Sequence, residues 1–172
     1  MKAVSLHGEK AAGRVALVDD EDYDLVMQYR WRGWEKRHPN GSIAGPYAVA
    51  GTRSPDGRRA VVKMHKLSTG WPMTDHRDHD GLNNQRSNLR PATKAQNNHN
   101  QGPQAGTSSR YKGVTWHRKV KKWQATIKLN GKSRYLGCFT SEEDAARAYA
   151  EAALVAQGEY AYAAREALGG AA

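Results

Sequence analysis

One polar stretch limits what this chain can fold into more than any other part of it. Residues 74–100, TDHRDHDGLNNQRSNLRPATKAQNNHN, crowd Asp, His and Asn side chains together. Burying one such group without a hydrogen-bond partner costs roughly 1–3 kcal/mol. A hydrophobic core cannot absorb this many of them, so they must face solvent, a metal ion, a phosphate or one another.

The same stretch carries the groups that phosphodiester hydrolysis needs. A base must deprotonate the attacking water, and positive charge must stabilise the phosphate and the departing oxygen. A neutral imidazole suits the base, and Mg²⁺ takes oxygen ligands while keeping several waters. Asp75 and His76 are adjacent, so on a strand their side chains point to opposite faces. They can share one site only if the strand bends or the metal sits at its end.

The pattern TDHRDHDGLNNQRSNLR, preceded by MHKLSTG and followed by ATKAQNNHN, resembles the HNH endonucleases, especially the phage- and intron-borne homing enzymes. The resemblance spans about residues 15–100, and its specific motif spans residues 75–97. It implies a ββα-metal fold of two strands, a long loop and a helix. It also implies Mg²⁺ as the cofactor, with Mn²⁺ as the alternative. By position it assigns a general base to His76, an orienting role to Asn88, and metal ligands to Asp75 and Asn97.

Several alternatives stay open within this stretch. His79 stands where relatives usually have glycine, so Asp78 and His79 form a second possible pair, although counting back from Asn84 and Asn88 favours the first. His-x-x-His could be a fragment of a zinc site, or the loop could have no chemistry at all. Upstream, His65 either packs within the scaffold or takes part in catalysis.

The first seventy residues predict a small α+β scaffold built on hairpins. Val15–Val18 reads as a strand, and DDEDYDLVMQYRW has the acidic start typical of a helix. Three more strands are expected at Trp31–Glu35, Pro46–Ala50 and Arg59–Lys63, separated by HPNGS and SPDGR, which carry turn signals. This region also supplies basic side chains that could touch phosphates: Arg30, Arg32, Lys36, Arg37, Arg53, Arg58 and Arg59.

The C-terminal part predicts a sheet and one helix beyond a linker. NQGPQAGTSS has no periodicity, and the segments RYKGVTWHR, KWQATIKL and SRYLGCF are strand-like. Asn130-Gly131 signals a hairpin. TSEEDAARAYAEAALVAQG reads as a helix capped by Thr140 or Ser141. Strand alternation turns one apolar set toward that helix: Val114, Ala125, Ile127, Leu136 and Phe139.

The cores YKGV, KWQATI, RYLGCF and EEDAARAYAEAA resemble the Apetala-two, or ethylene-response-factor, DNA-binding domain. The resemblance implies a three-stranded antiparallel sheet packed on one helix, which reads double-stranded DNA from the sheet face. Several family arginines are replaced here, so the family's base preferences are not carried over. Trp123 could equally belong to the core. By position the candidate DNA contacts are Lys112, Thr115, His117, Trp123, Thr126, Lys128, Arg134 and Tyr135.

Charge and composition agree with a polyanionic partner. Lys and Arg total 27 against 17 Asp and Glu, a formal net charge of +10. No run of eighteen apolar residues exists, so we expect no membrane span. The single cysteine, Cys138, allows no intrachain disulfide and fits a reducing cytoplasm, here that of a host cell of a phage or mobile element.

The sequence therefore predicts an α+β protein in four parts: an HNH domain with its scaffold over residues 1–100, a linker over 101–108, a DNA-binding domain over 109–163 and a tail over 164–172. The predicted activity is a metal-dependent, site-preferring DNA endonuclease. A monomer would nick one strand, whereas a concerted double-strand break would need a dimer. The alternatives are a DNA-binding regulator with an inactive HNH module, and an RNA-directed or structure-specific nuclease.

Overall fold

The computed structural model describes residues 1–9, 11, 13–37, 43–103 and 106–162. The chain divides into two compact units, Met1–Lys94 and a second unit that begins at Ala95. This division falls before the predicted linker. The short helix after the polar loop, Lys94–His99, therefore belongs almost entirely to the second unit. The fold class is α+β, as predicted, with several small antiparallel sheets. No helix among the described residues is long and apolar enough to cross a membrane.

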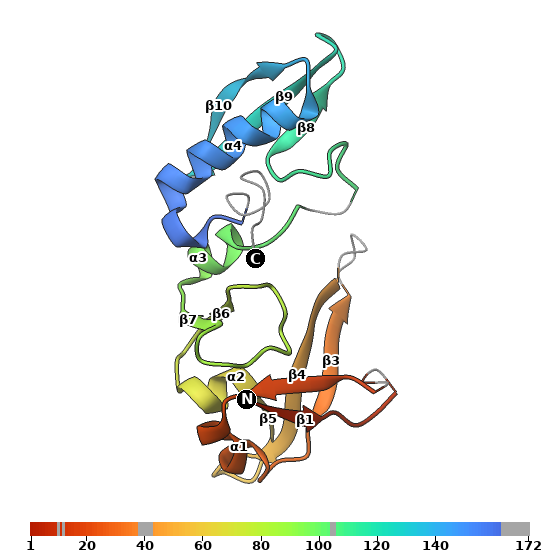
Figure 1. The fold of residues 1–172 in the computed structure, drawn as a ribbon, viewed down its shortest axis with the longest axis vertical. Helices are drawn as coiled ribbons and strands as arrows, with labels where there is room; N and C mark the ends of the chain where they lie inside the picture. Colours follow the sequence, from red (N-terminus) through yellow and green to blue (C-terminus); the bar gives the residue numbers. More distant parts are fainter. Residues whose placement is uncertain (10, 12, 38–42, 104–105, 163–172) are drawn as a thin grey trace. The chain divides into compact units, whose positions relative to one another are not determined.

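The first unit contains three antiparallel sheets and two short helices (Figure 1). The predicted strands at residues 15–18 and 59–63 are confirmed, whereas the first strand and the second helix were not predicted. The predicted turn at residues 38–42 lies outside the described residues. In chain order the elements are β1 (Lys2–Ser5), β2 (Val15–Val18), α1 (Asp20–Val26), β3 (Arg32–Arg37), β4 (Ile43–Arg53), β5 (Arg59–Lys63), α2 (Met64–Thr69), β6 (Thr74–His76) and β7 (Leu89–Pro91).

The strand β2 links the core of this unit to the polar loop between β6 and β7. Val18 is fully buried in the core, beside Trp31 and Met64. The edge of β2 that does not pair with β1 binds the loop. The Leu17 amide donates to the Leu82 carbonyl, and the Leu17 carbonyl accepts from the Asn84 amide, both at 2.8 Å. The loop is therefore tied to a strand of the scaffold.

The second unit is a three-stranded sheet covered by one long helix (Figure 1). The strand order is β10-β9-β8, and neighbouring strands are antiparallel. Asn130 and Gly131 both have positive φ, at 49° and 79°, which is the turn that this dipeptide predicts. The elements are α3 (Lys94–His99), β8 (Val114–His117), β9 (Lys122–Leu129), β10 (Lys132–Phe139), α4 (Glu142–Gln157) and a 3-10 turn (Gly158–Tyr160).

The helix α4 packs on the sheet through small residues. Ala145, Ala146 and Ala153 are buried against the sheet, and so is the ring of Tyr149. Gly113 is required beneath that ring, since a Cβ atom there would overlap it and the residue has φ +74°. The predicted apolar set on β8, β9 and β10 faces the helix and is confirmed.

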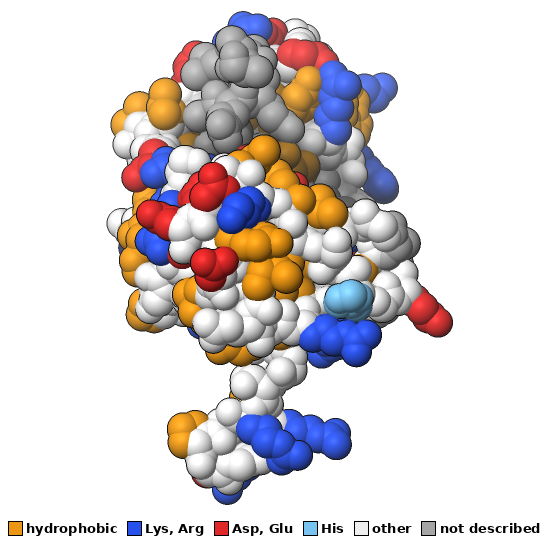
Figure 2. Space-filling view, turned by 60° about the horizontal axis from the view of Figure 1, so that its bottom comes forward, with side chains coloured by type: hydrophobic (Ala, Val, Ile, Leu, Met, Phe, Trp, Pro, Cys, Tyr) orange, Lys and Arg blue, Asp and Glu red, His pale blue; other side chains and the backbone are white. Residues whose placement is uncertain are grey.

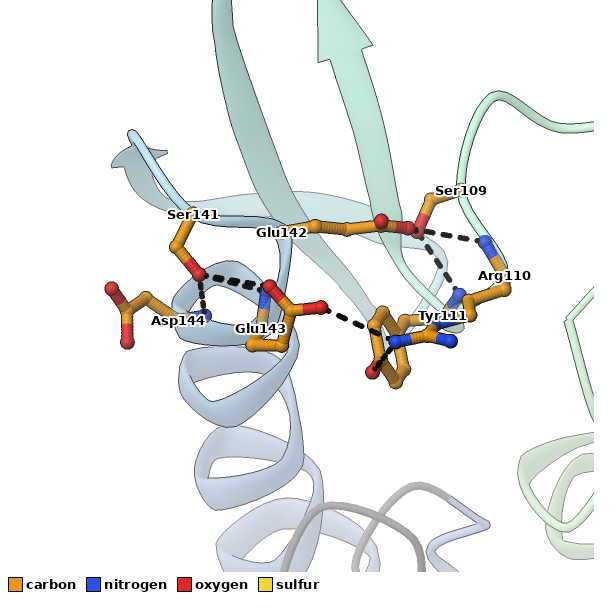
Figure 3. A network of polar contacts seen from close by, with 7 residues as sticks. All are labelled: Ser109, Arg110, Tyr111, Ser141, Glu142, Glu143 and Asp144. Carbon is orange, nitrogen blue, oxygen red and sulfur yellow. Dashed lines mark hydrogen bonds and ion pairs between the residues drawn. The ribbon is translucent and has the colours of Figure 1, made fainter.

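The N-terminus of α4 is capped by Ser141 and not by Thr140 (Figure 3). The Ser141 hydroxyl accepts from the amides of Glu143 and Asp144, at 3.1 and 3.2 Å. In the same network the Glu142 carboxylate accepts from the Ser109 hydroxyl, at 2.6 Å, and from the Arg110 amide, at 3.2 Å. The acidic first turn therefore also fastens the segment that enters the sheet.

Candidate active site and DNA-binding sheet

His76 is the last residue of β6, and its side chain is only 6% exposed. Its imidazole Nε2 lies 3.4 Å from Oδ1 of Asn84. The amide nitrogen of Asn84 points elsewhere, because it donates to the Leu82 carbonyl and to the sulfur of Met64. Oδ1 of Asn84 must then accept, so Nε2 of a neutral His76 carries the proton and Nδ1 carries the lone pair.

Two further rings pack beside His76. The rings of His65 and His76 pack in a T-shaped arrangement, with the centroids 5.0 Å apart and the planes at 83°. The Tyr47 ring lies 5.8 Å from His65 and 5.9 Å from His76, so the three rings form a triangle. Burial lowers the pKa of His65 to about 3, with smaller contributions from His76, Lys63 and Lys66. Burial also lowers the pKa of His76. Both imidazoles are therefore neutral at neutral pH.

Asp75 forms a buried ion pair across the two strands. The register pairs it with Arg90, and each side chain is 4% exposed. Nε and Nη2 of Arg90 approach the same carboxylate oxygen, Oδ2, at 2.8 and 2.7 Å. Neither contact uses Oδ1. The arginine thus neutralises and orients the carboxylate that the motif assigns to a metal.

Asn88 braces the loop between β6 and β7. Its side-chain oxygen accepts from the Asp78 amide at 3.0 Å, and its nitrogen donates to the Asp78 carboxylate and to the Asn83 carbonyl at 2.8 Å. The Asp78 carboxylate also accepts from the Asp80 amide and from the Asn83 side chain. The Asp78 carboxylate therefore stabilises the conformation of the loop.

The structure distinguishes the environments of the two Asp-His pairs. His76 is buried, whereas His79 is exposed and has φ +68°. Asn97 is half-buried on α3 and belongs to the second unit, and its role as a ligand stays a prediction. Among the described residues, no three or more His, Cys, Asp or Glu side chains group closely enough to hold a metal ion by themselves.

The register of the second unit divides the candidate DNA contacts between two faces. Thr126 pairs with Tyr135, and both lie opposite the helix side of the sheet. Arg134 pairs with buried Ile127 and lines a cavity against α4, so it differs from the expected open-face position. Trp123 also lies on the helix side, packed with the core. The candidates on the open face are Thr115, His117, Thr126, Lys128 and Tyr135.

Lys112 makes a structural contact in place of the expected open one. Its ammonium donates to the carbonyls of Asn98, His99 and Gln101, at 3.0, 2.7 and 2.7 Å. Burial lowers its pKa to about 8. Lys112 therefore closes the C-terminal end of α3, where helix carbonyls lack partners in the helix itself.

We expect Lys112→Met to destabilise the second unit by about 1–3 kcal/mol, because it leaves three carbonyls without their cationic donor. Urea unfolding, combined with hydrogen exchange of the α3 amides, measures this loss. Lys128→Met removes an equal charge from an exposed position, and we expect it to change stability by less than about 0.5 kcal/mol. Equal losses in the two variants would contradict the capping role.

The chain is similar to known proteins of two kinds. A relative in Acanthamoeba polyphaga mimivirus, named an uncharacterized HNH endonuclease, is 40% identical over 145 residues, which cover 81% of this chain and 69% of the relative. This chain belongs to the HNH endonuclease family. No family model matches this HNH protein, and no solved structure matches it.

The other similarity of this HNH protein is to plant proteins. The AP2-like ethylene-responsive transcription factor TOE2 of Arabidopsis thaliana is 37% identical over 70 residues, 41% of the chain and 14% of the factor. APETALA2-like protein 2 of Oryza sativa is 44% identical over 57 residues, 33% of the chain and 13% of the plant protein. The chain spans only a small part of these proteins, so the likeness is that of one domain.

Four residues around the HNH site were not assigned to it from the sequence. Asn84 enters the sequence argument only through its spacing, yet it is fully buried beside the site. Gly81 is buried as well, and a Cβ atom on it would meet the Tyr47 ring. Arg90 carries no local signal, because its partnership with Asp75 depends on strand register. The sequence leaves the role of His65 open and predicts only a strand around Tyr47.

Proposed function

We propose that this protein is a metal-dependent DNA endonuclease that nicks duplex DNA, with its C-terminal sheet holding the substrate. The observation that carries this proposal is the buried His76, whose Nε2 lies 3.4 Å from Oδ1 of Asn84. In the tautomer that this contact favours, Nε2 donates to Asn84 and Nδ1 holds the lone pair. Nδ1 can accept a proton from a water that attacks a phosphodiester, and a neutral imidazole is the form that does so.

The metal would be held by Asp75 and Asn97, with Mg²⁺ as the first choice. One carboxylate and one amide oxygen are hard donors, and Mg²⁺ commonly binds few protein groups and keeps waters. When bound, the metal supplies positive charge for the attacked phosphate and the departing oxygen. Arg90 holds the Asp75 carboxylate in place through two contacts to Oδ2, while Asn88 keeps the loop folded beside His76.

The polarity of the second unit supports DNA binding by its open face. Between residues 106 and 162 every acidic residue lies in α4 or the following 3-10 turn, whereas the strands and their turns carry many lysines and arginines. A positive face without carboxylates attracts phosphates, and exposed side chains on it can reach base edges. Basic side chains also gather elsewhere, and Figure 2 shows several on the narrow lobe at the bottom of that view.

A nicking assay tests the proposal. Supercoiled plasmid is incubated with the protein and Mg²⁺, and conversion to open circles is measured with and without EDTA. We expect metal-dependent nicking that His76→Ala removes. Tight DNA binding without nicking in Mg²⁺ or Mn²⁺ would instead favour a DNA-binding regulator. Preferred cleavage of branched DNA or RNA over duplex would favour the third alternative.

The pH dependence of nicking should reflect the environment of His76. Since burial lowers its pKa below the ordinary 6.5, the imidazole stays neutral to a lower pH and can still act as a base there. We expect the acid limb of the cleavage rate to have its midpoint below 6.5, with the rate lost as pH falls through that midpoint. Single-turnover rates from about pH 5 to 8 measure it. A midpoint above the ordinary value would contradict the assignment.

Lys128→Ala should weaken binding to target and random DNA alike and reduce the slope of log affinity against log salt by about 0.9, the value for one phosphate contact. Lys132→Ala is the matched control, because Lys132 pairs with Leu129 on the helix side of the same hairpin. We expect the control to keep the slope of the unchanged protein. Equal slopes for the two variants would show that the open face does not carry the phosphate contact.

A further inference from the structure

We propose that His65 is a positioning residue that holds the imidazole of His76 in its working orientation through the ring triangle with Tyr47. This inference rests on the proposed function only for its activity readout. The argument comes from contacts within the first unit, and the ring orientation can be measured without cleavage.

The contact between the two imidazoles is suited to fixing an orientation. Edge-to-face packing at 5.0 Å and 83° is a favoured arrangement of aromatic rings. Turning the His76 ring about its Cβ–Cγ bond would change this edge-to-face contact.

The third ring limits the movement of the other two. Tyr47 contacts both imidazoles, and its own ring is held against the backbone of the loop at Gly81. Lys63 lies over the same ring, with Nζ 5.4 Å from its centroid. The triangle is therefore supported by both the β4–β5 sheet and the loop.

The helix α2 reaches His76 by a second route that is independent of the rings. Met64 precedes His65, and its sulfur accepts from the Asn84 amide nitrogen at 3.4 Å. Oδ1 of the same Asn84 faces Nε2 of His76. Two consecutive residues of α2 therefore restrain the His76 imidazole. His65 contacts the ring directly, and Met64 holds Asn84, which faces Nε2.

The described contacts of His65 fit packing better than proton transfer. The structure gives its ring nitrogens no hydrogen bond among the described residues, while the ring itself contacts both His76 and Tyr47. If the ring shape carries the role, phenylalanine should replace it. If a ring nitrogen carries the role, phenylalanine should fail as alanine does.

The experiment compares His65→Ala and His65→Phe in the full chain. We expect His65→Ala to lower the nicking rate at saturating DNA on the order of 100-fold, a cost typical of misplacing a reacting group, with DNA affinity unchanged. We expect His65→Phe to restore most of that rate. Tyr29→Ala is the control, since it removes a ring contact with Trp31, at 5.6 Å, from another part of the same core. It should keep the full nicking rate.

Nitrogen NMR of the His76 imidazole supplies a readout that does not need cleavage. We expect one Nε2-protonated form in the unchanged protein and in His65→Phe, and a broadened or mixed-tautomer signal in His65→Ala. Loss of rate and of the single NMR form in both variants, or in neither, would overturn the positioning role. If the unchanged protein does not nick but its NMR behaviour is as expected, the proposed function fails and the inference stands.

Discussion

Replacing His76 by alanine should lower the rate of DNA cleavage by about 10²–10⁴-fold and leave DNA affinity unchanged. The expected loss is large because the imidazole is the base proposed to take the proton of the attacking water. The His76 side chain is buried against the rings of Tyr47 and His65. It is therefore not expected to bind a phosphate, and its removal should not weaken DNA binding. Single-turnover cleavage and equilibrium DNA binding are measured on the same duplex.

The matched control for that experiment is His79→Ala. His79 lies three residues after His76, in the loop that follows β6. It is exposed, and its backbone is in the left-handed region, with φ +68°. The neighbouring Asp78 carboxylate is bound by Asn88 within the loop. We expect the control to cleave at nearly the unchanged rate. If His79→Ala loses cleavage while His76→Ala keeps it, the second Asp-His pair is the catalytic one.

Replacing Arg90 by alanine should destabilise the first unit by about 3–5 kcal/mol, the usual cost of leaving one partner of a buried ion pair alone. Asp75 and Arg90 are each 4% exposed, so water cannot replace the lost contact easily. Urea unfolding, followed through amide signals of the first unit, measures the change. We expect cleavage to fall with it, because the carboxylate proposed as a metal ligand loses its orienting partner.

Two further variants separate stability from chemistry at this pair. Arg58→Ala breaks an exposed ion pair with Asp56, and such solvent-screened pairs contribute little to stability. A double change, Asp75→Leu with Arg90→Met, removes both charges and should recover much of the stability without recovering cleavage. A loss for Arg90→Ala no larger than that for Arg58→Ala would show that the buried pair is not needed for the fold.

Local patterns in the sequence were enough to predict several strands, turns and helices, because these elements depend on interactions between neighbouring residues. Alternation on β9, the Asn130-Gly131 turn and the acidic start of α1 each follow from neighbouring residues, and the structure has them as expected. The short helix α2 was not predicted because its six residues carry no periodic signal and its N-cap, Lys63, makes no side-chain capping hydrogen bond. The tail beyond Tyr162 lies outside the described residues.

The HNH motif in the sequence was enough to place the chain in its family and to pick out His76, since that motif is a matter of residue order and spacing. What surrounds His76 could be known only from the fold. Asn84 reaches it because β2 pins the loop, His65 and Tyr47 reach it because α2 and β4 pack together, and Arg90 meets Asp75 through strand register. Such contacts join residues distant along the chain, so no local pattern encodes them. The same reason explains why Lys112 contacts the end of α3 and why Arg134 lies on the helix side of the sheet.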